Sequence, residues 1–147
     1  MRTFVLLLAV AGTALSVPSC GQTPIKPDLT QGERIVGGTV ATPYSWPWNV
    51  ALCSVGWGQG CSLECGASII DNNWVMTAAQ CVYQDATPSS YNIKAGFFKY
   101  TADSEDGSAT VNLKAIFMHP KFDPNVPADD FALLQASFLQ DCYRMKE

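Results

Sequence analysis

Short runs of β-type residues alternate with clusters of turn-forming residues through most of this 147-residue chain. Strands that bury one face alternate apolar and polar positions, and Gly, Pro, Asn, Asp and Ser gather in the turns between them. No amphipathic helical stretch of any length is present, except a short piece at the tail. We therefore expect an all-β barrel or sandwich. The expected strands span residues 48–55, 65–70, 74–77, 91–98, 110–118 and 131–134.

A different pattern precedes the strands. Residues 1–16 carry Arg2, an apolar run over residues 4–11 and small residues before Val17, which is typical of a cleaved signal peptide. The run is shorter than the roughly 20 apolar residues that cross a bilayer. Residues 17–34 are rich in Pro, Gly and polar residues and form an extended, propeptide-like lead segment. We expect a secreted, extracellular protein without a membrane anchor.

The composition fits one packed domain. The chain is 48% hydrophobic and 15% charged, which favours a buried core over disorder. Its length leaves room for one domain rather than two. The net charge is −4. This acidic balance gives no electrostatic footprint for nucleic acid or for an anionic membrane, so we expect neither as a partner.

Six cysteines in a secreted chain favour disulfides. Zinc is the alternative, since the spacing of Cys61 and Cys65 is tolerable for a pair of metal ligands. However, His119 is the only histidine, it lies far along the chain, and no second close pair completes four ligands. We therefore expect no metal and no cofactor. The six residues are Cys20, Cys53, Cys61, Cys65, Cys81 and Cys142.

Six stretches carry a family resemblance through their order and spacing. They are Arg34–Gly38 (RIVGG), Ser45–Trp48 (SWPW), Cys65–Ile70 (CGASII), Asn73–Cys81 (NWVMTAAQC), Met118–Asp123 (MHPKFD) and Asp130–Leu134 (DFALL). Together they resemble the trypsin/chymotrypsin family of serine proteases. The resemblance implies two six-stranded Greek-key β-barrels with the active site between them. The expected strands would form only the first barrel, over residues 35–135, followed by a divergent tail at residues 136–147.

The resemblance assigns two residues to catalytic positions. In this family a serine attacks the substrate, a histidine takes the proton of that serine, and a buried aspartate orients the histidine. Asp130 matches the aspartate, with Asp129 as the alternative, and Gln80 stands where the family has histidine. A glutamine amide has no basic nitrogen, so Gln80 accepts no proton near neutral pH. It is still able to hydrogen-bond to Asp130 and to preserve the local shape.

The nucleophile of the family has no counterpart in this sequence. The Gly-Asp-Ser-Gly-Gly stretch of the family is absent, and Ser68 lies on an expected strand. Ser62 and Ser137 lack the surroundings of a nucleophile. His119 matches a surface His-Pro of the family and not the catalytic position. We therefore expect the chain to be catalytically inactive as written.

Three cysteine pairs are expected on different grounds. They are Cys65–Cys81, Cys53–Cys61 and Cys20–Cys142. The first matches the disulfide that crosses the catalytic histidine loop of the family. The second is a local pair outside the basic family pattern. The third resembles the bridge from a propeptide cysteine to the region after the Asp130 strand, although its second cysteine comes earlier than in the family.

The sequence thus favours a secreted trypsin-like serine protease homologue that is inactive as written. The alternatives are a pseudo-protease that acts as a binding or regulatory module, and a non-functional fragment of a longer serine endopeptidase. The resemblance implies zymogen cleavage between Arg34 and Ile35, either as real processing or as an inherited site with no present role. The expected partners are an activating trypsin-like protease, or a protein that covers the barrel face normally packed on the second barrel.

Overall fold

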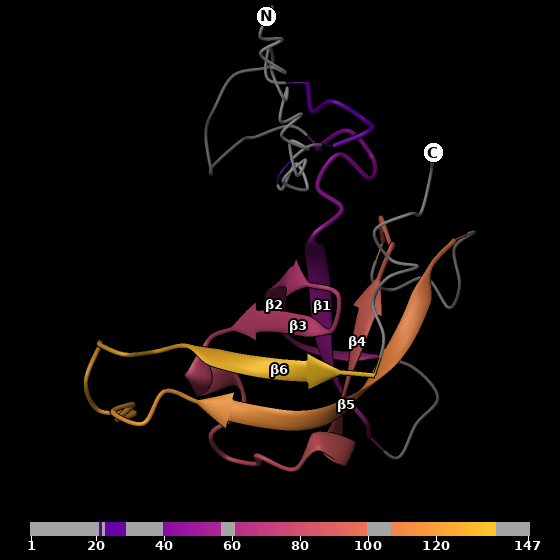
Figure 1. Ribbon diagram of the computed structural model, residues 1–147. Coiled ribbons are helices and arrows are strands. Elements are labelled where there is room, and N and C mark those ends of the chain that lie inside the picture. The colour runs from indigo at the N-terminus through magenta and orange to yellow at the C-terminus, as the bar shows by residue number, and fades with distance from the viewer. Residues whose placement is uncertain (1–20, 22, 29–39, 57–60, 100–106, 138–147) are drawn as a thin grey trace, which may run out of the picture.

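The computed structural model describes residues 21, 23–28, 40–56, 61–99 and 107–137, and it forms a closed β-barrel (Figure 1). Its antiparallel strands follow one another in the order β1-β2-β3-β6-β5-β4, and β4 pairs with β1. The fourth strand therefore lies beside the first of three consecutive strands, which is the Greek-key arrangement. The strands are β1 (Asn49–Ser54), β2 (Ser62–Asp71), β3 (Trp74–Thr77), β4 (Tyr91–Ala95), β5 (Ala109–Met118) and β6 (Ala132–Ala136).

All six expected strands are present, so the prediction of an all-β barrel is confirmed. β4 ends at Ala95 and not at residue 98, because Gly96 has a φ of 71° and leaves the extended conformation. β6 continues to Ala136, which is fully buried. Within the described residues the helical elements are the two 3-10 turns η1 (Ala79–Cys81) and η2 (Pro88–Ser90), and neither is long and apolar enough to span a membrane.

The core fills the inside of the barrel with residues from neighbouring strands. Leu52 on β1 lies opposite Ile93 on β4, and Val75 on β3 lies opposite Leu134 on β6; all four are fully buried. Burying a side chain of this size stabilises the fold by about 1.5–3 kcal/mol. Val82, which follows η1, is also fully buried and belongs to the same core. The turn after β3 is therefore anchored to the barrel.

Register shifts bend two of the strands. The extra residues are Glu64 and Ile70 on β2 and Lys114 on β5. An extra residue on one strand of an antiparallel pair increases the local twist and bends that strand. These bends help a sheet of six strands to curve until its first and last strands pair.

Several sequence-based expectations lie outside the described residues. They are the signal peptide at residues 1–16, Cys20, the cleavage site at Arg34 and Ile35, and Cys142 in the tail. All of them stay predictions.

Candidate functional site

Gln80 and Asp130 meet where β3 ends and β6 begins. The two strands are antiparallel neighbours, and Thr77 at the end of β3 lies opposite Ala132 at the start of β6. Gln80 follows β3 within η1, and Asp130 precedes β6. The strand pairing therefore brings together two residues that are 50 positions apart in the sequence.

Two hydrogen bonds join this pair. The backbone N–H of Gln80 donates to Oδ1 of Asp130 at 2.8 Å, and the side-chain Nε2 of Gln80 donates to Oδ2 at 2.8 Å. Each carboxylate oxygen thus receives one N–H from the same residue. The amide nitrogen carries only donor hydrogens, so this arrangement holds the carboxylate but supplies no base.

The segment around Gln80 is fixed from both sides. Ala79 and Val82 are fully buried, and Val82 donates its backbone N–H to the carbonyl of Ala79 at 3.0 Å. Before the turn, the Thr77 hydroxyl donates to the Gly66 carbonyl at 2.9 Å. Buried neighbours and satisfied hydrogen bonds leave the backbone of Gln80 little freedom to shift away from Asp130.

Two disulfides join described residues of the chain. Cys65–Cys81 joins β2 to η1 with a Cα–Cα distance of 6.2 Å, and Cys53–Cys61 joins the end of β1 to the start of β2 at 5.1 Å. The first bond covalently ties the residue after Gln80 to the barrel. Closing a loop of this length stabilises a fold by roughly 3 kcal/mol.

Asp129 and Asp130 contact different partners. The Oδ1 of Asp129 lies 3.4 Å from Nδ1 of His119, without the geometry of a hydrogen bond. Asp129 has a φ of 57°, a left-handed conformation that Asp tolerates better than most residues. This backbone turn directs the two consecutive carboxylates to separate places. Of the two aspartates that the sequence offered, it is Asp130 that contacts Gln80.

His119 belongs to a small cluster at the end of β5. Its ring packs on Phe131 with the ring centroids 4.5 Å apart, and its backbone N–H donates to the Phe131 carbonyl at 3.0 Å. The imidazole therefore makes contacts with Phe131 and Asp129. These contacts suit a structural role for His119.

The three serines considered as nucleophiles occupy strand positions or strand ends. Ser68 is in β2, opposite Asn49 on one side and Met76 on the other. The carbonyl of Ser62 accepts a hydrogen bond from the Ser54 hydroxyl at 3.5 Å. The Ser137 hydroxyl donates to the Asn112 carbonyl at 2.9 Å. None of these contacts is with the Gln80–Asp130 pair.

A polar cavity of about 490 Å³ opens beside Gln80, on the side of the Cys65–Cys81 disulfide. We call it the Tyr91 cavity. It is lined by Ser54, Val55, Glu64, Cys65, Gln80, Cys81, Gln84, Asp85, Ser90 and Tyr91. Sequence reasoning missed this site because its walls come from four separate segments. Asp85 lies in a run of turn-forming residues, but a turn alone does not indicate a cavity.

Two groups in the Tyr91 cavity have shifted pKa values. Hydrogen bonds from the Ser90 side chain, and then from Thr87, lower the pKa of Asp85. The backbone N–H of Thr87 donates to Asp85 Oδ1 at 2.9 Å. Burial raises the pKa of Tyr91, and the negative charges of Asp85 and Glu64 raise it further. At neutral pH the cavity therefore holds an ionised aspartate and a neutral phenol.

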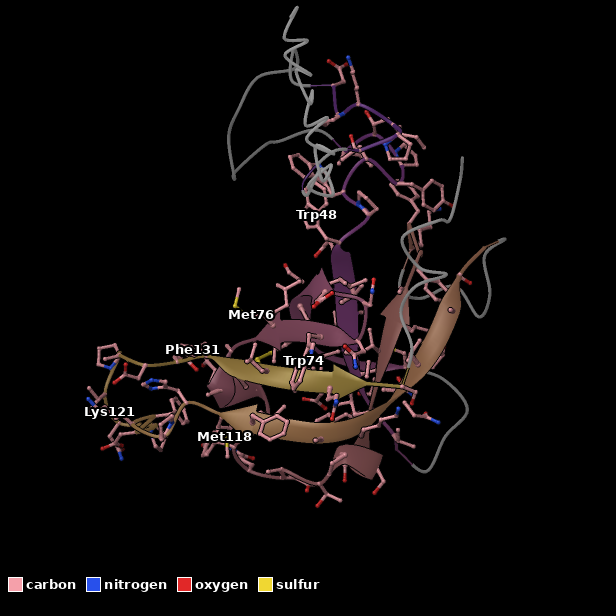
Figure 2. All side chains as sticks on the ribbon, viewed as in Figure 1. Trp48, Trp74, Met76, Met118, Lys121 and Phe131 are labelled. Carbon is pink, nitrogen blue, oxygen red and sulfur yellow. A yellow bond between two sulfur atoms is a disulfide. The ribbon has the colours of Figure 1, made fainter. Side chains whose placement is uncertain are left out.

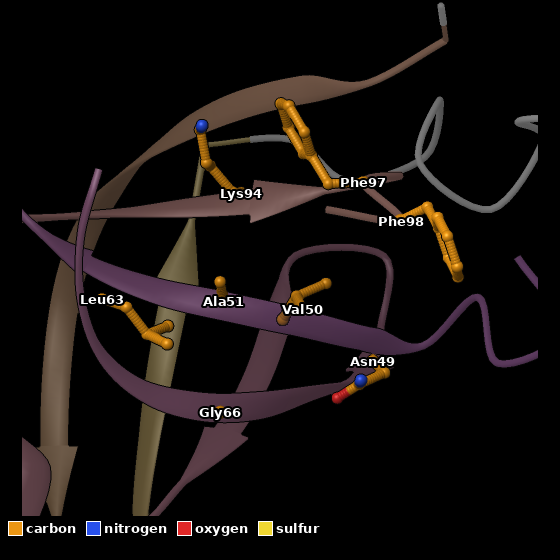
Figure 3. Close-up of a pocket in the computed structure, with 8 residues that line it drawn as sticks. All are labelled: Asn49, Val50, Ala51, Leu63, Gly66, Lys94, Phe97 and Phe98. Carbon is orange, nitrogen blue, oxygen red and sulfur yellow. The ribbon is translucent and has the colours of Figure 1, made fainter. Parts of the chain in front are cut away.

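A second cavity, of about 250 Å³, lies over β1, β2 and β4 (Figure 3). Lys94 is only 8% exposed, and its Nζ lies 4.4 Å from the centroid of the Phe97 ring. Val50, Ala51 and Leu63 form much of the apolar wall. Neither Gln80 nor Asp130 lines this cavity, so it is separate from the candidate site.

No metal site is apparent in the described ranges. No group of three or more His, Cys, Asp and Glu side chains is placed there to hold a metal ion. The expectation that the protein needs no metal or cofactor stays a prediction.

Comparisons with known proteins identify the family. The family model described as Trypsin matches residues 35–139. Chymotrypsin-C of Mus musculus is 30% identical over 132 residues, which cover 88% of this chain and 46% of the mouse protein. The chymotrypsin-C proteins of Rattus norvegicus and Bos taurus are each 33% identical, over 79% and 80% of this chain and 41% of their own length. This chain therefore spans less than half the length of these relatives, and it belongs to the trypsin/chymotrypsin-like serine protease family.

Proposed function

We propose that the protein is a secreted trypsin-like serine protease homologue that hydrolyses no peptide bond. The observation that carries the proposal is the pair of hydrogen bonds from Gln80 to Asp130. In the family, the aspartate orients a histidine, and that histidine removes the proton of the serine. Here the carboxylate orients an amide instead, and an amide takes up no proton at neutral pH.

The missing base has a large energetic consequence. Removing one member of a complete triad typically lowers kcat by about a million-fold, as mutants of subtilisin show. The sequence also lacks the Gly-Asp-Ser-Gly-Gly stretch that carries the nucleophile in the family. The amide at position 80 supports inactivity without regard to that stretch.

The test is a comparison of the native chain with the Gln80→His variant on peptide substrates. We expect no hydrolysis by either protein, because the variant restores the base but not the nucleophile. The same chain after limited trypsin treatment controls for a requirement for cleavage between Arg34 and Ile35. Hydrolysis that a serine-directed reagent abolishes would contradict the proposal.

A second candidate function is binding, and an apolar patch on the outside of the barrel favours it. We call this patch the outer apolar face, and it consists of Ile70, Trp74, Met76 and Phe117. Ile70, Met76 and Phe117 are 48%, 44% and 52% exposed. The Trp74 and Phe117 rings approach to 5.7 Å between centroids, across the strand β6 that separates them. Figure 2 labels Trp74 and Met76 on this part of the barrel.

Contiguous exposed apolar side chains of this kind mark interfaces or aggregation-prone surfaces. Under the binding hypothesis, a protein partner covers the outer apolar face and the protein acts as a pseudo-protease. Sedimentation of the purified chain tests whether the outer apolar face forms a complex. Met76→Glu would abolish a specific complex, whereas the exposed control Lys121→Glu would leave it intact. A monomer that stays soluble at high concentration would count against the binding hypothesis.

A further inference from the structure

The floor of the second cavity, of about 250 Å³, is made by two small residues. Ala51 on β1 lies opposite Gly66 on β2 and also opposite Lys94 on β4. Residues directly opposite one another on neighbouring strands share a face of the sheet, and here that face is the outside of the barrel. A Cβ placed on Gly66 would meet no heavy atom within 4 Å, so the space above it is open. We call this space the Lys94 cavity.

Lys94 stands at one end of this row of residues. It is only 8% exposed, and its Nζ lies 4.4 Å from the centroid of the Phe97 ring. Figure 3 shows the two side chains pointing to the same side. Among the described residues that line the cavity, Lys94 is the one that is ionisable. An ammonium that is largely removed from water attracts an opposite charge more strongly than an exposed one. This end of the cavity therefore favours an anion.

The mouth of the Lys94 cavity is apolar. Leu63 and Phe98 both line it, and they are 44% and 38% exposed. Large apolar side chains beside a cavity lose contact with water when a ligand covers them, which favours binding. The Phe98 ring packs on Tyr44 with the ring centroids 6.2 Å apart, so this wall is supported before a ligand arrives.

The dimensions of the cavity limit the length of a ligand. Gly66, Ala51 and Lys94 lie on three neighbouring strands, so the row that they form is about 10 Å long, or two strand spacings. The volume is smaller than the roughly 300–1,000 Å³ of pockets for drug-sized molecules. A ligand that fits is therefore short and ends in a single anionic group.

We propose that the Lys94 cavity binds a small monocarboxylate with an unbranched apolar chain, of which octanoate is the example. The carboxylate accepts hydrogen bonds from the Lys94 ammonium. The chain lies over Ala51 and Gly66, between Leu63 and Phe98. A free carboxylate is favoured over an acidic polypeptide, because one ammonium at the end of a short apolar slot matches one carboxylate. This activity goes beyond the proposed function and involves neither residue of the Gln80–Asp130 pair.

The experiment uses the full chain with its disulfides formed and octanoate as the probe. Calorimetry measures the affinity, and the backbone amide NMR signals of Gly66 and Phe97 locate the ligand. Octanamide keeps the chain without the charge, and butanoate keeps the charge on a shorter chain. We expect octanoate to shift both signals and to bind about tenfold more tightly than octanamide. It should bind about a hundredfold more tightly than butanoate, because each buried methylene contributes up to about fourfold.

Variants identify the groups responsible. Lys94→Met removes the charge and keeps an unbranched stem, so it should weaken octanoate about tenfold and leave octanamide almost unchanged. Lys114→Met, at an exposed lysine of β5, is the matched control and should bind like the native chain.

Gly66→Val tests the floor of the cavity. It places a side chain in the open space and should weaken octanoate and octanamide alike, by about tenfold. Gly56→Val is its control, since Gly56 is equally open to a Cβ and is not among the residues that line the cavity. Thermal unfolding verifies that each variant is folded, and Lys94→Met tests the proposal even where Gly66→Val fails to fold.

Three outcomes would overturn the proposal. They are equal affinity for octanoate and octanamide, native affinity for octanoate in Lys94→Met, and native affinity in a folded Gly66→Val. Tighter binding of the acidic peptide acetyl-Ala-Ala-Glu-Ala-Ala-amide than of octanoate would assign the cavity to polypeptides and would overturn the choice of a small carboxylate. None of these measurements involves hydrolysis of a peptide bond, so this proposal and the proposed lack of activity fail separately.

Discussion

Gln80 holds Asp130 through two hydrogen bonds of 2.8 Å, one from its backbone N–H and one from its side-chain amide. The pair joins the end of β3 to the start of β6, two neighbouring strands of the closed barrel. The shape of the site is thus retained by a residue that supplies no base.

The first prediction concerns this pair. Asp130→Asn replaces one acceptor oxygen with a second donor, so one of the two hydrogen bonds from Gln80 is lost. Because Gln80 is exposed, we expect the free energy of unfolding to fall by only about 1 kcal/mol. Asp129→Asn is the control and should change it by less than about 0.5 kcal/mol, since it removes only a partly exposed contact with His119. Urea unfolding measures both, and equal losses would contradict the prediction.

The second prediction concerns the disulfide next to Gln80. Replacing Cys65 and Cys81 with Ala opens a loop whose ends are separated by 16 residues. We expect a loss of about 3 kcal/mol in the free energy of unfolding. Removing Cys53–Cys61, with a separation of 8 residues, should cost about 2.5 kcal/mol. The proton NMR signals of Gln80 should also broaden in the first variant only. Unchanged signals would argue against the role of this disulfide in fixing the turn.

The third prediction compares two adjacent residues of β6. Leu134 is fully buried opposite Val75, whereas Leu133 is only half-buried and lies between Met76 and Phe117 on the outside. Leu134→Ala should lower the free energy of unfolding by about 2–5 kcal/mol, because it opens a cavity in the core. Leu133→Ala should cost about 1 kcal/mol. The reverse order in thermal or urea unfolding would mean that the register of β6 is wrong.

Much of the barrel follows from the sequence. The alternation of apolar and polar residues located all six strands, since only one face of each strand is buried. The pattern did not give the end of β4 or the start of β2, where Gly96 and the Cys53–Cys61 connection set the limits. Such ends depend on backbone turns and tertiary contacts more than on hydrophobic periodicity.

Less of the candidate site than of the barrel could be predicted from the sequence. The resemblance selected Asp130 and Gln80, but only the backbone turn at Asp129 explains why the neighbouring carboxylate contacts His119 instead. The Tyr91 cavity could not be predicted, because Glu64, Asp85 and Tyr91 look like ordinary strand and turn residues. Their common position appears only after β1, β2 and β4 have paired and η1 has packed against the barrel.

The fourth prediction is a dependence of stability on alkaline pH. Burial and two neighbouring carboxylates raise the pKa of Tyr91 in the folded state. The folded state therefore favours the neutral phenol, and its contribution to stability is complete below pH values near 10 and is lost as the pH rises through the folded pKa. Between pH 8 and 11 the native chain should lose more stability than Tyr91→Phe. Tyr83→Phe, at an exposed position, should behave like the native chain.

The same loss in the native chain and in Tyr91→Phe would show that other groups control alkaline unfolding. In that case the burial of the Tyr91 hydroxyl beside Asp85 and Glu64 would need to be revised.

The most direct test of the central claim is the intact mass of the native protein after incubation with a fluorophosphonate, which modifies activated serines. The reaction should be run before and after trypsin treatment, with an active serine protease as the positive control. The proposed absence of a base at position 80 predicts that the mass stays unmodified in both samples. A stoichiometric adduct on one serine would contradict the account, because it requires an activated nucleophile despite Gln80.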